Sequence, residues 1–208
     1  MFPKYTAPMA VACLLAACLA LAIASHKPQV VTAAATVTPA YTSSGEMLSP
    51  TNYREWIYLT TGIDMSYFPK PAGMEDHSMF DNVFVNPEAY RSFLEKGTWP
   101  DKTVMVLEAR EARSKGSINQ HGQFQTDWMG MAVEVKDSSR FPDKWAYFTF
   151  GGTNKTSEAM PKANPCWQCH EDHAAVEHTF VQFYPTLKPV AKKFGVYNQS
   201  REQVQDAK

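Results

Sequence analysis

The sequence predicts an α+β fold, mainly an antiparallel β-sheet with flanking helices. Strand-like segments separated by short polar turns predict the sheet, because antiparallel neighbours need only short connections. Helix-like segments lie before, within and after this strand-rich region, at residues 49–62, 86–97 and 166–184. The 208 residues, 44% of them hydrophobic, are enough for one well-filled core, so a single folded domain is expected.

The first half of the domain should contain two helices and a strand. A Ser-Pro pair starts the helix expected at residues 49–62, which carries its larger side chains on one face and stops at Gly62. Residues 80–85 have the composition of a strand. An Asn-Pro pair then predicts a helix start, and Gly97 predicts its end.

The second half should contain three strands and a final helix. Residues 103–112 alternate between two faces, with Leu107 on one of them. Residues 123–136 and 145–150 predict two more strands joined by a polar turn. A helical stretch from Cys166 to about residue 184 follows, ended by prolines.

The N-terminus has the pattern of a secretory signal peptide. Residues 1–24 hold one lysine, an apolar run over residues 7–24 and small residues at the end. An uncleaved membrane anchor is the first alternative, although the run is short for a span. Lipidation of Cys18 is the second, although the residues after it stay apolar. All three interpretations place the folded part outside the cytoplasm, which predicts a periplasmic protein.

The rest of the chain divides by composition. Residues 25–47 are rich in Thr, Ala, Ser and Pro and predict a flexible spacer. Residues 48–197 should form the folded domain, and residues 198–208 a polar tail. The formal net charge of −1 offers no basic face, so a nucleic-acid partner is not expected. Membrane contact is expected only through the N-terminal segment, if it stays uncleaved.

One pentapeptide carries the clearest chemical signal. Cys166-Trp167-Gln168-Cys169-His170 is C-x-x-C-H, the attachment pattern of c-type haem. The two thiols add across the haem vinyl groups, and two intervening residues let both sulfurs reach them. The residue that follows, His170, then supplies an imidazole to the iron. The sequence therefore predicts one covalent haem c bound by Cys166 and Cys169, with His170 as the metal ligand.

Two other uses of the cysteines remain open at this stage. Zinc could take Cys166 and Cys169 together with His173 and His178, because C-x-x-C is half of a zinc site. That interpretation leaves His170 without a role. A disulfide or redox pair is also compatible with an oxidising compartment.

The second axial ligand is not evident from the sequence. No Met follows Met160, and His173 and His178 lie on the same segment as His170. Upstream side chains are more often core or surface than ligands. An iron with an open or weakly held sixth position is therefore favoured, and such a site binds small ligands. The upstream candidates are Met79, Met105, Met129, Met131, His77 and His121.

Several blocks, in the same order, resemble the cytochrome P-460 family over about residues 50–195. The resemblance implies a monohaem c-type protein built on a largely antiparallel sheet, usually a periplasmic homodimer. Cytochromes P-460 proper oxidise hydroxylamine and carry a lysine cross-linked to the haem ring. Cytochromes c′-beta lack the cross-link, have an apolar distal pocket and bind NO and CO. The blocks are residues 52–56 (NYREW), 85–90 (VNPEAY), 101–104 (DKTV), 135–141 (VKDSSRF), 145–146 (WA), 166–170 (CWQCH) and 179–185 (TFVQFYP).

The residues aligned with the distal pocket favour the c′-beta branch. The Lys, Arg and Glu of the hydroxylamine-oxidising relatives align with Leu107, Asp81 and Ala132. Phe80 and Leu107 are expected to form an apolar cap over the iron. Lys102 and Lys115 would each need a register shift to take the place of the cross-linking lysine.

The favoured hypothesis is therefore a gas-binding haem protein. It would bind NO, and also CO, for scavenging, transport or sensing, with a redox partner protein and a homodimeric assembly as further expectations. No residue is assigned to catalysis. A hydroxylamine- or NO-oxidising cytochrome P-460 is the first alternative, and an electron carrier with two strong axial ligands is the second.

Overall fold

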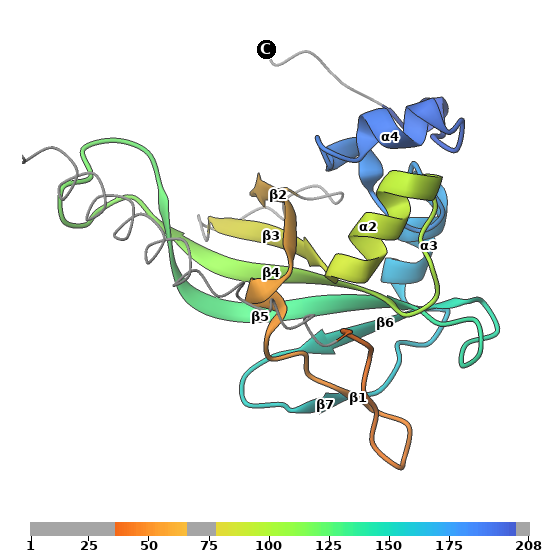
Figure 1. The fold of residues 1–208 in the computed structure, drawn as a ribbon. Helices are drawn as coiled ribbons and strands as arrows, with labels where there is room; N and C mark the ends of the chain where they lie inside the picture. The colour runs from red at the N-terminus through yellow and green to blue at the C-terminus, as the bar shows by residue number, and fades with distance from the viewer. Residues whose placement is uncertain (1–35, 66–77, 203–208) are drawn as a thin grey trace, which may run out of the picture. The chain divides into compact units, whose positions relative to one another are not determined.

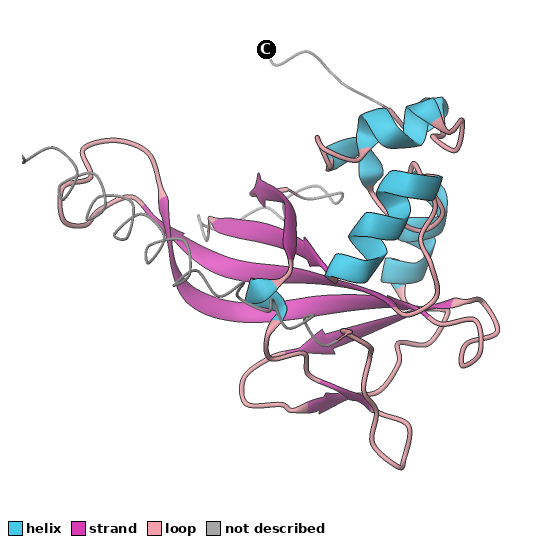
Figure 2. Ribbon diagram, in the orientation of Figure 1, coloured by secondary structure: helices cyan, strands magenta, loops and turns pink. Residues whose placement is uncertain are grey.

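A computed structural model describes residues 36–65 and 78–202. Its main element is a five-stranded antiparallel sheet in the order β2-β3-β4-β5-β6, so sequential strands are neighbours throughout (Figures 1 and 2). A second, two-stranded sheet pairs β1 with β7. The α+β prediction, with a mainly antiparallel sheet and flanking helices, is confirmed.

The elements follow the chain in a simple order. The α-helices are α2 (Pro87–Lys96), α3 (Pro165–His173) and α4 (Lys188–Lys193), and short 3-10 turns are η1 (Tyr53–Glu55), η2 (Val181–Phe183) and η3 (Gln199–Arg201). The strands are β1 (Met47–Leu48), β2 (Ile57–Ile63), β3 (Met79–Val85), β4 (Thr103–Arg113), β5 (Phe124–Lys136), β6 (Trp145–Phe150) and β7 (Thr156–Ser157).

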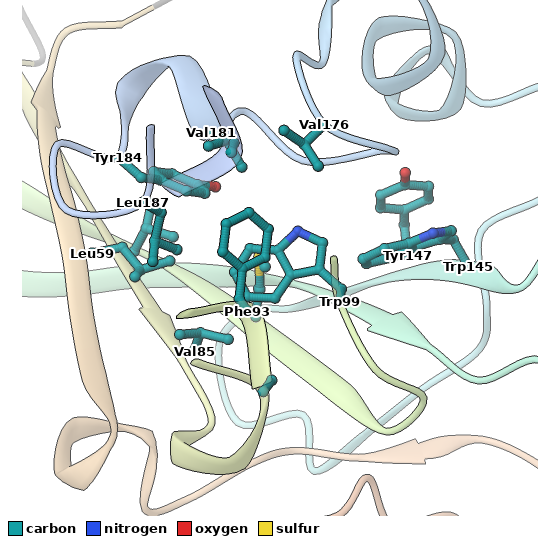
Figure 3. Close-up of a cluster of buried hydrophobic side chains, with 14 of the residues drawn as sticks. Leu59, Val85, Phe93, Trp99, Trp145, Tyr147, Val176, Val181, Tyr184 and Leu187 are labelled. Carbon is teal, nitrogen blue, oxygen red and sulfur yellow. The ribbon is translucent and has the colours of Figure 1, made fainter. Parts of the chain in front are cut away.

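The three α-helices cover one face of the large sheet (Figure 1). Phe93 of α2 and Trp99 lie in the middle of this layer, with ring centroids 4.2 Å apart (Figure 3). Gly97 ends α2 with a φ of 72°, and a Cβ there would lie 2.6 Å from the Cβ of Phe194. Glycine therefore satisfies both the left-handed backbone and the close approach of the C-terminal segment. The strands contribute Val83, Val85, Met105 and Tyr147 to this face.

The N-terminal segment covers part of the opposite face. Met47 is buried there against residues of β4, β5 and β6, and Val37 and Tyr41 pack beside it. This differs from the flexible spacer predicted for residues 25–47. Polar composition suggested a linker, but Tyr41 and Met47 supply enough apolar surface to order residues 36–47 on the sheet. Residues 25–35 lie outside the described part.

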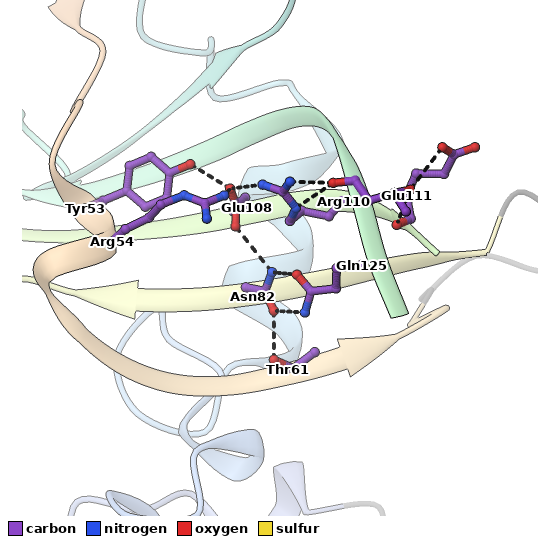
Figure 4. A network of polar contacts seen from close by, with 9 residues as sticks. Tyr53, Arg54, Thr61, Asn82, Glu108, Arg110, Glu111 and Gln125 are labelled. Carbon is purple, nitrogen blue, oxygen red and sulfur yellow. Dashed lines mark hydrogen bonds and ion pairs between the residues drawn. The ribbon is translucent and has the colours of Figure 1, made fainter. Parts of the chain in front are cut away.

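A buried polar network fixes the register of the central strands (Figure 4). Glu108 of β4 is only 1% exposed; its carboxylate accepts hydrogen bonds from Tyr53, Arg54, Arg110 and Asn82. Asn82 also exchanges two hydrogen bonds with Gln125 of β5, at 2.7 and 3.0 Å. These contacts join η1, β3, β4 and β5, so a register slip would leave a buried charge without partners.

Two expected helices differ from the structure. The helix predicted over residues 49–62 is wrong, because the chain forms the turn η1 and then strand β2. Ile57, Tyr58, Thr60 and Thr61 have side chains that favour a strand, and β3 offers them a partner. The helix predicted from Cys166 to about residue 184 ends at His173 as α3, and a short bridge and η2 follow.

The predicted signal peptide at residues 1–24 lies outside the described residues. In the predicted tail, Gln199–Arg201 form η3, and Glu202 pairs with Lys188 and Lys192. Within residues 36–65 and 78–202, the helices are all too short or too polar to cross a bilayer.

Candidate functional site

Helix α3 presents the C-x-x-C-H pentapeptide on one short segment. Asn164 precedes the helix, and its side-chain oxygen accepts a hydrogen bond from the Cys166 backbone N–H at 2.9 Å. Pro165 occupies the first helical position. Residues three and four apart share a helix face, so the thiols of Cys166 and Cys169 and the imidazole of His170 lie together. Both cysteines are free, and burial raises the pKa of the Cys169 thiol.

The imidazole of His170 has a fixed orientation. Its Nδ1 lies 2.5 Å from the backbone oxygen of His178, which can only accept a hydrogen bond. The proton is therefore on Nδ1, and the lone pair of Nε2 is left for a metal. The ring contacts those of Tyr147 and Phe180, with centroid distances of 4.5 and 4.6 Å. Burial alone would lower the pKa of His170, but the nearby Glu134 carboxylate and the hydrogen bonds at the ring raise it overall.

An apolar cavity opens beside His170 and Cys166. It encloses about 530 Å³, counting space open to solvent, and lies between the sheet and the C-terminal segments. Leu107 and the neighbouring Ala132 are exposed on the sheet face that lines it, and Leu107 is 37% exposed. The lining side chains also include Val83, Met105, Met160, Phe180 and Tyr184.

A second cavity adjoins the first, with which it shares Leu107 and Phe180. Asp81 lines this second cavity from β3. Burial, and to a lesser degree the charge of Asp64, raises the pKa of Asp81 to about 6. The structure therefore places three of the predicted distal residues, Leu107, Ala132 and Asp81, along one continuous surface.

Phe80 is the exception, and its prediction is corrected by the structure. Asp81 and Val83 point into the cavities, so strand alternation turns Phe80 and Phe84 to the opposite face. Phe84 packs in the cluster on that face. Phe80 therefore does not cap the site. Two aromatic rings line both cavities, and they belong to Phe180 and Tyr184, which follow α3 in the sequence.

Few of the side chains considered as a second axial ligand reach the cavity. Met105 lines it, as does Met160. Met131 is buried on the opposite face of the sheet, Met129 and His121 are exposed, and Met79 lines neither cavity. His77 lies outside the described residues.

The two lysines considered for a cross-link also lie elsewhere. Lys102 donates a hydrogen bond to Asp137 at 2.5 Å, in the turn before β4. Lys115 is exposed in the turn between β4 and β5. Neither lines the two cavities, as their strand register predicts.

The zinc alternative finds no support in the described part of the chain. Across residues 36–65 and 78–202, no cluster of three or more His, Cys, Asp or Glu side chains is arranged to hold a metal ion. His178 instead lies beside Trp145 and Trp167, each with a ring centroid 5.9 Å away.

Comparison with known families agrees with this site. The sequence model of the family described as Cytochrome P460 matches residues 50–181, which is more than half of the chain. The chain belongs to the cytochrome P460 family. No curated protein matches the sequence closely enough to be counted as a relative.

Proteins of the cytochrome P460 family bind one covalent haem c with iron, so this protein is a haem c-type cytochrome. The residues present fit that group. Two free thiols and an imidazole with an available Nε2 lie beside an apolar cavity. Cys166 and Cys169 would hold the haem covalently, and His170 would bind its iron.

The structure adds Glu134 and Tyr147 to the surroundings of His170. Both are buried, and both line the cavity. Strand alternation offered a signal for Glu134, because it shares a face of β5 with Ala132. What the sequence could not show is that α3 folds onto this end of β5, which brings His170 against Glu134.

Proposed function

We propose that this cytochrome P460 protein binds NO at an open or weakly held sixth iron position, in the periplasm, for scavenging, transport or sensing. The apolar character of the Leu107 and Ala132 surface carries this proposal. Hydroxylamine-oxidising relatives are expected to hold a lysine and a glutamate at these positions. When bound, haem iron supplies the coordination position for the diatomic ligand.

The protein's own residues account for the selectivity of such a site. NO needs no hydrogen-bond donor to bind ferrous haem tightly, whereas bound O₂ gains from polar donors. Leu107 and Ala132 supply apolar surface only. His170, whose ring is fixed by the His178 carbonyl, would supply the imidazole that binds the iron. The cavity therefore suits NO and CO better than ligands that depend on hydrogen bonding.

The deciding experiment is an optical spectrum of the reduced, full-length protein with and without NO and CO. A high-spin spectrum that changes on addition of either gas is expected. A Soret band far to the red would reveal a lysine cross-link and overturn the proposal. A low-spin spectrum that ignores both gases would indicate a strong sixth ligand, for which Met105 and Met160 are the candidates at the cavity.

Oxidation of hydroxylamine is the second candidate, and Asp81 is the observation that favours it. Removing protons from hydroxylamine requires a base near the iron. Asp81 lines the adjoining cavity, and its pKa of about 6 suits a base at neutral pH. Turnover of hydroxylamine with an electron acceptor, lost in Asp81→Asn, would support this function over simple NO binding.

We also propose where the protein acts and what it assembles with. A leader at residues 1–24 and haem c attachment outside the cytoplasm together support a periplasmic location. A homodimer and a redox partner protein are proposed from the family resemblance. Fractionation of cells that express the full chain tests the location, and sedimentation of the purified protein tests the dimer.

A further inference from the structure

Glu134 is a buried carboxylate to which NO binding, as described above, assigns no role. Its side chain lies on the cavity face of β5, and the residue is only 8% exposed. Apart from His170, no residue that the structure describes donates a hydrogen bond to its Oε2. The same oxygen lies 3.2 Å from Nδ1 of His170. A buried acidic group in this situation is costly unless a partner compensates it.

The single proton on Nδ1 of His170 faces two acceptors. The backbone oxygen of His178 lies 2.5 Å away, and Glu134 Oε2 lies 3.2 Å away. A carbonyl orients the ring, whereas a carboxylate also draws the proton toward itself and leaves more electron density on Nε2. The low-dielectric surroundings, to which the neighbouring rings of Tyr147 and Phe180 contribute, strengthen this effect.

We propose that Glu134 is a positioning residue that acts through His170, fixing its ring and making Nε2 a stronger electron donor to the haem iron. This inference rests on the proposed function in one respect, because it assigns His170 as the iron ligand. It also deepens that function, because it predicts how His170 behaves when NO binds. Bound NO would weaken the bond between the iron and His170, and a more basic His170 would oppose that weakening. The protein should therefore keep His170 bound when NO binds.

The test compares Glu134→Gln with wild-type protein, both ferrous and without NO. In the variant, the iron–histidine stretching frequency in the resonance Raman spectrum should fall. The midpoint potential should rise, enough to increase the reduced-to-oxidised ratio at the wild-type midpoint about tenfold. Glu177→Gln is the matched control, because that carboxylate pairs with Lys136 at 2.6 Å and lines neither of the two cavities. The control should leave the frequency unchanged.

The stretching frequency separates a hydrogen bond from a simple effect of charge. Loss of a nearby negative charge alone would raise the potential and leave the frequency where it was, and that result would overturn the proposal. Glu134→Asp keeps the charge on a shorter side chain and should give an intermediate frequency. If a sixth ligand hides the band, the photolysed CO adduct provides the same measurement.

Two further readouts keep the test decisive. If Glu134→Gln fails to fold, the wild-type protein alone provides a test. Its iron–histidine stretching frequency should exceed that of a ferrous haem whose imidazole donates its hydrogen bond only to a carbonyl. A wild-type value at or below that reference would contradict the role of Glu134. With NO added, wild type should give the electron paramagnetic resonance spectrum of a six-coordinate adduct, and Glu134→Gln should shift toward five-coordinate. Absence of NO binding would refute the proposed function and leave the frequency comparison valid.

Discussion

Leu107 of β4 and Ala132 of β5 are register partners in the centre of the sheet, and both are exposed on the face that lines the cavity beside His170. The next residues along the same face, Met105 and Glu134, are buried. The solvent exposure of this sheet face therefore does not extend to Met105 and Glu134. Under the proposed function, the exposed part is the part of the sheet that faces a ligand on the iron.

Leu107→Ala should speed the binding of CO to the reduced protein. Removing the larger side chain from the cavity wall lowers the steric barrier, and a loss of about 1.4 kcal/mol raises the rate about tenfold. Flash photolysis measures this rate directly. Phe80→Ala is the matched control, because that side chain lies on the opposite face of the neighbouring strand. Equal rates in wild type and Leu107→Ala would show that Leu107 is not near the bound ligand.

Covalent attachment of haem should depend on both thiols of α3. The double variant Cys166→Ala, Cys169→Ala should show no haem stain on a denaturing gel, because no sulfur remains to bond the vinyl groups. Each single variant should keep one thioether, which a pyridine haemochrome spectrum detects as a shift of the α band. Haem that survives denaturation in the double variant would contradict the assignment.

Glu108→Gln should destabilise the fold by about 2 kcal/mol at neutral pH, because the buried hydrogen bonds to a charged acceptor weaken. Burial alone would raise the pKa of Glu108, but hydrogen bonds from Tyr53 and Arg54 and the charge of Arg54 lower it overall. In the unfolded chain the carboxyl titrates near its ordinary value of 4.5. The ionised group therefore stabilises the fold above that value, and the contribution is lost as pH falls through the lowered folded pKa.

Urea unfolding at several pH values tests this sign. The difference between wild type and Glu108→Gln should be full at pH 7 and should shrink in acid. Glu95→Gln is the control, because Glu95 is exposed on α2, and its effect should stay within about 0.5 kcal/mol. A difference that grew on acidification would mean that Glu108 is not held ionised by its partners.

How far the sequence predicts this structure depends on the range of the interactions involved. The helix that begins at Pro87 and ends at Gly97 was predictable, because proline and glycine act within a single turn. The alternation over residues 103–112 correctly predicted β4 and the face of Leu107. The helix predicted over residues 49–62 is wrong. The spacing of Tyr53 and Trp56 fits a helix, but their burial comes from contact with strands of the large sheet.

The site shows the same division. The pentapeptide is a local signal, and the structure places all three of its chemical groups on α3. The family resemblance predicted Phe80 over the iron, but strand alternation puts Phe80 and Asp81 on opposite faces of β3. Glu134 was missed because its contact with His170 joins residues far apart in the sequence, and only the packing of α3 on β5 creates it.

Asp81 should make the reduction potential depend on pH. Its pKa is about 6, raised by burial and, less strongly, by Asp64. As pH rises through that value the carboxyl becomes negatively charged beside the site, which favours ferric over ferrous iron. The potential should therefore fall between about pH 5 and about pH 7, within the range where such a group titrates. Asp81→Asn should remove this dependence, and redox titration at a series of pH values measures it.

Asp127→Asn is the matched control, because Asp127 is exposed near the far end of β5 and lines neither cavity. If Asp81→Asn kept the full pH dependence, another group would have to carry the charge, and Asp81 would lose its case as a base for hydroxylamine.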